Sequence, residues 1–197
     1  LDLHGPSFAV YSACSSGLLA VVQAADLLKS GRCDVALVGA ASLVLPDAIG
    51  HYYQPGMIYS PDGHCRPFDV QSAGTVRGSA VGVVALRLLS EAIRDNNPIL
   101  AVLEGYSVNN DGKMKSSFTA PNIDGQIECL KGAIASMNSG DVEYVECHGT
   151  GTEIGDSIEL IAMSEAYTRE LFIGSVKANI GHGFAGAGLA GLFKICK

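Results

Sequence analysis

An apolar, β-prone run that stops abruptly at a cysteine is the feature that most constrains how this chain can fold. The run covers residues 8–13, Cys14 follows it, and an apolar-periodic segment then extends from Leu18 to Leu28. This pattern predicts a strand that ends in a tight turn, with Cys14 at or near the first turn of a helix. At such a position the unpaired backbone N–H groups and the positive end of the helix dipole favour a thiolate.

The residues around the cysteine support a functional interpretation of this turn. A helix can pack closely on a strand there because the neighbours are small, namely Ala13, Ser15, Ser16 and Gly17. A strand-to-helix turn of this kind often carries a nucleophile. Because free cysteines are also common as small buried hydrophobes, the position alone leaves both interpretations of Cys14 open.

Composition narrows the class of protein. The chain has 197 residues, 48% hydrophobic and 17% charged, which indicates one packed domain or part of a larger one. The net charge of −7 disfavours nucleic acid as a partner, because binding to phosphates needs a basic surface. The six cysteines lack the spacing of metal sites or disulfide frameworks, so we expect reduced thiols, no metal and a cytoplasmic location. No run is long enough to span a membrane, and no signal peptide is visible.

Strand and helix patterns alternate along the rest of the chain, which predicts an α/β fold with buried, largely parallel strands. Residues 46–79 are turn-rich and irregular, and a connection of this length usually has a function. Asp156 and Glu159 have the spacing of a capping box that opens a helix, and we assign them no chemistry. The other expected elements are strands at 34–41, 81–89, 100–108, 142–147 and 171–176, and helices at 18–28, 88–94, 124–137 and 183–196.

Two histidines stand where predicted strands end in glycine-containing turns, His148 and His182. Sites in α/β folds are built at strand ends, and one thiol with two imidazoles suits acyl-thioester chemistry. The thiol would take the acyl group, while the imidazoles would bind a carbonyl that gains charge or would move protons. A lone histidine more often has a structural role than a catalytic one. The position of Lys177 fits a structural ion pair as well as it fits a catalytic role. Thr150 and Thr152 lie in the same turn as His148 and could be ordinary turn residues.

Several motifs, in order along the chain, together resemble the β-ketoacyl synthase (ketosynthase) domain of polyketide synthases. Any one of these motifs is weak evidence, but the ordered set is highly specific. The motifs are Gly5-Pro6-Ser7, Ala13-Cys14-Ser15-Ser16, Ser60-Pro61-Asp62-Gly63-His64-Cys65-Arg66-Pro67-Phe68-Asp69, Glu146-Cys147-His148-Gly149-Thr150-Gly151-Thr152 and Val176-Lys177-Ala178-Asn179-Ile180-Gly181-His182.

The resemblance implies a thiolase-like layered αβαβα fold and a Cys-His-His site. Cys14 would be the acyl-accepting nucleophile, His148 and His182 would assist decarboxylation of the extender unit, and Lys177 would support the histidines electrostatically. The chain would hold the rear of the amino-terminal half and most of the carboxy-terminal half, with a boundary near residues 95–105. The first and last residues suggest a fragment, so we expect an incomplete fold that lacks amino-terminal strands and a carboxy-terminal loop, and an isolated chain without activity.

The resemblance also implies the substrates and partners. Thr150 and Thr152 would bind the phosphopantetheine arm of an acyl carrier protein, which delivers acyl and malonyl thioesters, and no cofactor would bind the chain directly. The complete domain would form a homodimer. Related synthases often have serine at the position of Gly17, and a carboxylate at the position of Phe184, so Lys177 would need another partner here.

Other interpretations share part of this pattern. A thiolase-fold acyltransferase without decarboxylation usually has a second catalytic cysteine, for which Cys129, Cys147 and Cys196 offer no convincing motif. A catalytically silent ketosynthase that only serves as a scaffold usually lacks the cysteine or a histidine. A cysteine hydrolase would leave the second histidine without a role.

Overall fold

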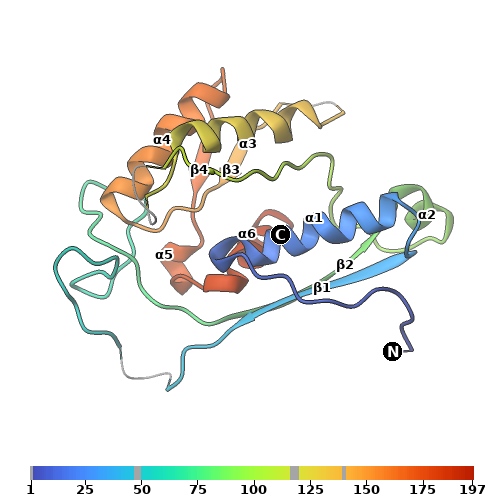
Figure 1. Cartoon of the computed structure of the whole chain (residues 1–197), viewed down its shortest axis with the longest axis horizontal. Helices are drawn as coiled ribbons and strands as arrows, with labels where there is room; N and C mark the ends of the chain where they lie inside the picture. Colours follow the sequence, from blue (N-terminus) through green and yellow to red (C-terminus); the bar gives the residue numbers. More distant parts are fainter. Residues whose placement is uncertain (1, 47–49, 116–119, 139–140) are drawn as a thin grey trace. The chain divides into compact units, whose positions relative to one another are not determined.

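The computed structural model describes residues 2–46, 50–115, 120–138 and 141–197 (Figure 1). The chain divides into two compact units, each assembled from stretches that are far apart in the sequence. Unit 1 comprises Leu1–Val44, Gly78–Val102 and Gly183–Lys197, and unit 2 comprises Leu45–Arg77 and Leu103–His182. Cys14 therefore belongs to unit 1, while both candidate histidines belong to unit 2.

Unit 1 is a two-stranded ribbon covered on one face by two helices. Strands β1 (Val35–Ser42) and β2 (Ala80–Arg87) pair antiparallel. Helix α1 (Ser16–Lys29) lies along the ribbon in Figure 1, α6 (Ala187–Ile195) packs against β2 and α1, and short α2 (Leu89–Arg94) follows β2. Alternate strand residues face the helices, as the two-residue period of a strand requires. The resulting core contains Val21, Ala24, Val38 and Leu189, with partly buried Ala20, Ala36, Ala40, Val84, Leu86 and Leu192 packed against it.

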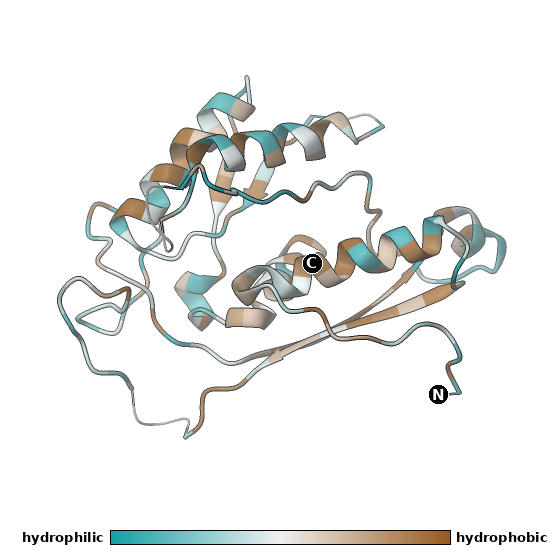
Figure 2. Cartoon of the chain, viewed as in Figure 1, coloured by the Kyte–Doolittle hydropathy of each residue, from teal (hydrophilic) through white to brown (hydrophobic). Residues whose placement is uncertain are grey.

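Helix α1 matches the expected segment in both position and pattern. Hydrophobic and hydrophilic residues alternate along it at helical spacing (Figure 2). The helix ends at Ser30 and Gly31, where Gly31 adopts a φ of 68°. The Arg32 N–H then donates to the Leu27 carbonyl at 3.0 Å, which satisfies a carbonyl that the helix leaves open.

Unit 2 contains a short parallel pair of strands and a pair of packed helices. Strands β3 (Tyr144–Glu146) and β4 (Phe172–Gly174) align with Tyr144 opposite Phe172. Helix α4 (Glu153–Ala166) connects them and packs against α3 (Ile123–Ala135), as Figure 1 shows. One turn of helix, α5 (Lys177–Ile180), follows β4. In the described ranges, no helix is long and apolar enough to cross a membrane.

The irregular segment predicted at 46–79 is confirmed where the structure describes it, since residues 50–79 form no helix and no extended strand. A single bridge joins Tyr59 to Thr75. The Ser60 N–H donates to the Thr75 carbonyl at 2.8 Å, and the Thr75 N–H donates to the Ile58 carbonyl at 2.7 Å. The segment thus folds back on itself within unit 2.

Two of the expected strands are not formed. Residues 8–13 have no pairing strand, because in the described part of unit 1 the only ladder joins β1 and β2. Residues 100–108 have no strand partner either. Their polar groups bond to α3 instead: the Tyr106 N–H donates to Ser136 Oγ at the end of the helix, at 2.9 Å, and Cys129 Sγ in the middle of the helix donates to the Ser107 carbonyl at 3.4 Å.

Strand direction also differs from the expectation of a largely parallel sheet. The longer pair, β1 with β2, is antiparallel, and only the short pair, β3 with β4, is parallel. Continuous apolar runs of this kind indicate buried strands but do not determine their direction. Even burial is one-sided here, because Val35, Leu37, Val81 and Val83 on the other face of the ribbon are exposed.

Candidate active site

Cys14 lies in the short 3-10 helix η1 (Ala13–Ser15), directly before α1. Ala13 precedes it in the left-handed region with a φ of 44°, so the backbone turns sharply at this point. Serine side chains hold the turn. The Ser12 N–H donates to Ser16 Oγ at 2.9 Å, and that hydroxyl donates to the Ala13 carbonyl at 2.7 Å. The predicted turn and helix are present, and the thiol is half-buried.

Gly17 allows another element of unit 1 to approach the base of this turn. A Cβ atom at Gly17 would lie 3.1 Å from the Ala185 carbonyl oxygen and 3.3 Å from Leu189 Cγ. Ala185 belongs to the 3-10 helix η2 (Phe184–Gly186), which leads into α6. A serine here would therefore require η2 and α6 to shift, which explains why glycine suits this chain.

His148 follows β3 in a turn that is bonded to α4. The backbone N–H groups of His148 and Gly149 donate to the two carboxylate oxygens of Glu159, at 2.6 and 2.8 Å. Gly149 has a φ of 38°, and a Cβ atom there would lie 2.6 Å from Ser175 Cβ, so only glycine fits. Burial, followed by the charge of Lys177 and the neighbouring His182, lowers the pKa of His148 to about 3.

His182 follows α5, and its side chain is 4% exposed. The backbone N–H of His182 donates to the Val76 carbonyl at 2.7 Å, and this hydrogen bond links His182 to the irregular segment of unit 2. Burial and the charge of Lys177 lower the pKa of His182 to about 4. Both imidazoles are therefore neutral at pH 7, and each offers one N–H donor and one acceptor nitrogen.

The two imidazoles lie together although they are far apart in the sequence. Their ring centroids are 5.4 Å apart and the rings meet edge to face, at 82°. Lys177 is buried in the same unit, and its charge acts on both rings. The structure thus brings together three of the four predicted catalytic residues. Cys14 belongs to unit 1, so its convergence with the histidines stays a prediction.

The turn after His148 also carries the two threonines. The Thr150 and Thr152 hydroxyls are 3.0 Å apart and both side chains are half-buried. Their predicted role in binding a carrier arm is not tested by this geometry. What the geometry provides is a pair of neighbouring hydroxyls at the start of α4, where Thr152 is the residue before the first helical turn.

The predicted capping box at Asp156 and Glu159 is wrong. Helix α4 already begins at Glu153, so both carboxylates lie inside the helix and reach back to the preceding turn. Asp156 accepts the N–H groups of Gly151 at 3.1 Å and Phe68 at 2.8 Å. Spacing i, i+3 puts both acids on one face of α4, and this spacing is the signal from which their role could have been found.

The charge of Lys177 also acts on these two carboxylates. Burial raises the pKa of Asp156 and of Glu159, while the charge of Lys177 opposes that rise at both groups. A third carboxylate, missed from the sequence, holds the turn before Lys177: Glu146 accepts the Val176 N–H at 2.5 Å. In the described residues no group of three histidine, cysteine, aspartate or glutamate side chains could hold a metal ion.

Comparisons with known proteins agree with this arrangement. Residues 1–92 match the family profile "Beta-ketoacyl synthase, N-terminal domain" and residues 100–197 match "Beta-ketoacyl synthase, C-terminal domain". One of the phenolphthiocerol/phthiocerol polyketide synthase proteins of Mycobacterium tuberculosis is 46% identical over 202 residues. Polyketide synthase PksN of Bacillus subtilis is 41% identical over 203 residues. The matches cover 98% and 99% of this chain, but only 14% and 4% of those proteins.

Solved structures give the fold. Ketosynthase twelve of the bacillaene polyketide synthase of Bacillus amyloliquefaciens matches with a TM-score of 0.94 and 40% identity, over 98% of this chain and 36% of that chain. The ketosynthase from module 1 of the bacillaene synthase of the same species matches with a TM-score of 0.89 and 41% identity, over 98% and 35% of the two chains. The expected thiolase-like α/β fold is thereby confirmed. With both halves of its length matching that family's profiles, the chain belongs to the β-ketoacyl synthase family.

Proposed function

We propose that this chain carries the reacting residues of a polyketide synthase ketosynthase, an acyltransferase that extends an acyl chain by decarboxylative Claisen condensation. In the first step the Cys14 thiolate attacks the thioester carbonyl of an acyl group on a carrier protein. The carrier thiol leaves, and the acyl group remains on Cys14 as a new thioester. One C–S bond forms and one breaks, so no external reagent is needed.

The second step forms the carbon–carbon bond. A malonyl group on the carrier loses carbon dioxide, and the electron pair of the broken bond becomes an enolate. The enolate carbon attacks the acyl carbonyl on Cys14, and collapse of the tetrahedral intermediate releases the Cys14 thiolate. The product is a β-ketoacyl group on the carrier, two carbons longer, and loss of carbon dioxide makes the step effectively irreversible.

One observation carries this proposal, the adjacent pair of neutral imidazoles formed by His148, whose residue is partly exposed to solvent, and buried His182. A neutral imidazole can donate its N–H to a thioester carbonyl as that oxygen gains negative charge. An imidazolium would more readily protonate the enolate before it reacts. Desolvation lowers the pKa of both rings and so favours their neutral state, and the positive charge of Lys177 acts in the same direction.

The carrier partner, the location and the assembly are part of the proposal. The Thr150 and Thr152 hydroxyls would bind the phosphopantetheine arm that presents both thioesters. The relatives are polyketide synthases, whose substrates travel on such carriers. The six free cysteines suit a reducing, cytoplasmic location. We also propose that the complete domain acts as a homodimer.

The test uses the full protein that contains this chain, incubated with an acyl-pantetheine thioester and then with a malonyl carrier. Intact mass and peptide mapping are expected to place one acyl group on Cys14. Cys14→Ala should abolish acylation, while Cys33→Ala, a matched change in the same unit, should leave it intact. Release of carbon dioxide from the malonyl carrier is expected to be lost in His148→Ala or His182→Ala. An acyl group on another cysteine, or carbon dioxide release that survives both histidine changes, would overturn the proposal.

A further inference from the structure

The turn that carries Thr150 is held from two sides by different parts of unit 2. At its start, Glu159 binds the N–H groups of His148 and Gly149, and Ser175 Oγ donates to the Gly149 carbonyl at 2.9 Å. These contacts fix the histidine end of the turn. The threonine end is held by Asp156 of α4, which accepts the Gly151 N–H at 3.1 Å, and by a second set of contacts that come from the irregular segment.

Three donors of the irregular segment reach the Thr150–Gly151 backbone. Ser72 Oγ donates to the Gly151 carbonyl at 2.5 Å, and the Gly74 N–H donates to the same oxygen at 2.7 Å. Cys65 Sγ donates to the Thr150 carbonyl at 3.3 Å. The carbonyls of Thr150 and Gly151 are therefore both bonded to residues far away in the sequence.

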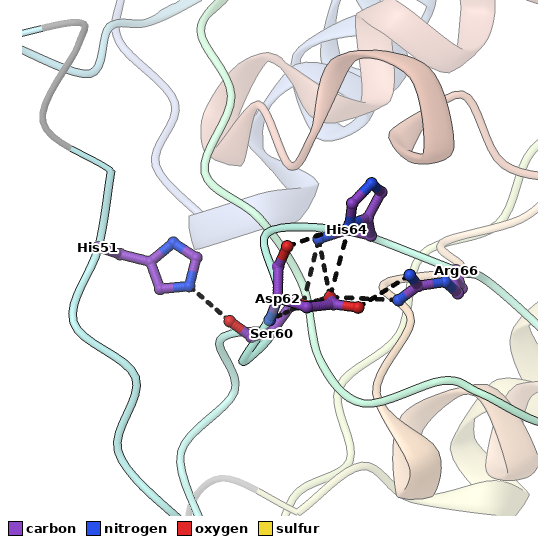
Figure 3. Close-up of polar contacts among 5 residues, drawn as sticks. All are labelled: His51, Ser60, Asp62, His64 and Arg66. Atoms are coloured by element: carbon purple, nitrogen blue, oxygen red, sulfur yellow. Dashed lines mark hydrogen bonds and ion pairs between the residues drawn. The ribbon is translucent and has the colours of Figure 1, made fainter.

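The irregular segment contains no helix or extended strand, but its residues are hydrogen-bonded to one another. Figure 3 shows the Asp62 carboxylate facing Ser60, His64 and Arg66. It accepts Ser60 Oγ at 2.8 Å, the His64 N–H at 3.1 Å and the Arg66 guanidinium at 2.8 Å. Ser60 and Thr75, which the bridge brings together, are 0% and 1% exposed. A loop with this much internal bonding holds a fixed shape.

We propose that segment Ser60–Thr75 positions the Thr150 and Thr152 hydroxyls for the carrier arm, with Ser72 as the main positioning residue. The inference rests on the proposed function, because it assigns the threonines to that arm. Hydroxyls on a fixed backbone lose little entropy when a ligand binds, so a firm support favours binding. Since the histidine end of the turn has its own contacts, loss of Ser72 should affect binding of the arm and spare the chemical step.

The test compares Ser72→Ala with Ser157→Ala in the full protein. Ser157 is the matched control because its hydroxyl donates to the Glu153 carbonyl at 2.7 Å, within α4. We expect Ser72→Ala to raise KM for the acyl carrier about three- to tenfold, the value of one hydrogen bond, with kcat unchanged. Ser72→Thr restores the hydroxyl and should return KM towards the original value. Amide hydrogen exchange at residues 149–152 should be faster in Ser72→Ala and unchanged in Ser157→Ala.

An unchanged KM with unchanged exchange, or an equal effect in Ser157→Ala, would overturn the proposal. So would a fall in kcat with KM unchanged. If Ser72→Ala does not fold, Cys65→Ala is measured in its place by the same KM and hydrogen-exchange readouts. Cys129→Ala is the control for this variant, because Cys129 Sγ also donates to a backbone carbonyl, at 3.4 Å. If the unmutated protein never acylates Cys14, the proposed function fails, and the exchange comparison still tests the positioning.

Discussion

Lys177 is a buried cation in a position where most proteins would place an apolar residue. Burial of a charge is costly unless other charges compensate for it. Here the carboxylates of Asp156 and Glu159 lie within range of the Lys177 charge, which lowers their pKa values against the effect of burial. The same charge lowers the pKa of both imidazoles.

Lys177→Met is expected to raise the pKa of both His148 and His182. Methionine keeps an unbranched chain but removes the positive charge that disfavours an imidazolium. The rise should be incomplete, because burial is the larger cause of both shifts and remains in the variant. NMR titration of the histidine ring protons checks this directly, and the acid limb of the pH–activity profile should move to higher pH.

Lys131→Met provides the control for this measurement. Lys131 lies on α3 in the same unit and is exposed, so its removal should leave both titrations unchanged. Unchanged pKa values of His148 and His182 in Lys177→Met would show that the charge of Lys177 does not act on the two imidazoles.

At the level of elements, α4 does more than connect two strands. Its first turns place Asp156 and Glu159 under the turn between β3 and α4, where the two carboxylates accept three backbone N–H groups of that turn, and Asp156 also accepts the Phe68 N–H. Acidic residues near the amino end of a helix also interact favourably with its dipole. Helix α4 thus holds the backbone turn that carries His148.

Glu159→Ala is expected to destabilise the ketosynthase domain by roughly 1–3 kcal/mol, because it leaves the His148 and Gly149 N–H groups without their acceptor. Glu159→Gln keeps one acceptor oxygen and should cost less. Urea unfolding of the variants measures the change, and Glu165→Ala, an exposed glutamate on the same helix, is the control. Equal stability of Glu159→Ala and Glu165→Ala would contradict this account of α4.

Elements set by local periodicity could be predicted from the sequence, and those set by distant partners could not. Helix α1 and strand β1 lie within two residues of the expected bounds, because apolar spacing and the Ser30–Gly31 stop are local signals. The apolar residues 100–108 resemble a strand equally well, but a strand also needs a neighbour. In this fold their backbone groups bond to Ser136 at the end of α3 instead.

The same division applies to the candidate site. His148 and His182 could be found from glycine-rich turns that follow strands, and the two rings do meet. The carboxylates of α4 were misassigned because their spacing also fits a helix cap, and only the fold shows that they face backwards. The contacts of Ser72 and Cys65 with the Thr150–Gly151 backbone join residues far apart in the chain. No local pattern predicts such contacts.

For the molecule as a whole, each unit is assembled from separated stretches, so neither can form until distant parts of the chain have met. In unit 1 the carboxy-terminal helix α6 completes the core beneath α1, with Leu189 fully buried. In unit 2 the bridge between Arg77 and His182 joins the irregular segment to the end of α5. Folding therefore brings the buried cysteines into contact with partners that the unfolded chain does not offer them.

The reactivity of the cysteine thiols toward alkylating reagents reports whether this assembly has formed. Cys65 and Cys147 are buried in unit 2, and burial raises the pKa of both thiols, that of Cys147 to about 12. At pH 8 roughly one Cys147 in ten thousand would be a thiolate, the form that alkylating reagents attack.

We expect iodoacetamide to modify neither Cys65 nor Cys147 in the native full protein and to modify both after unfolding in urea, as peptide mapping by mass spectrometry would report. Half-buried Cys33 and Cys196 provide the comparison within the same sample. Additional chain in the full protein can cover a thiol but cannot expose one that this fold buries, so modification of native Cys65 or Cys147 at the rate of the unfolded chain would contradict the packing of unit 2.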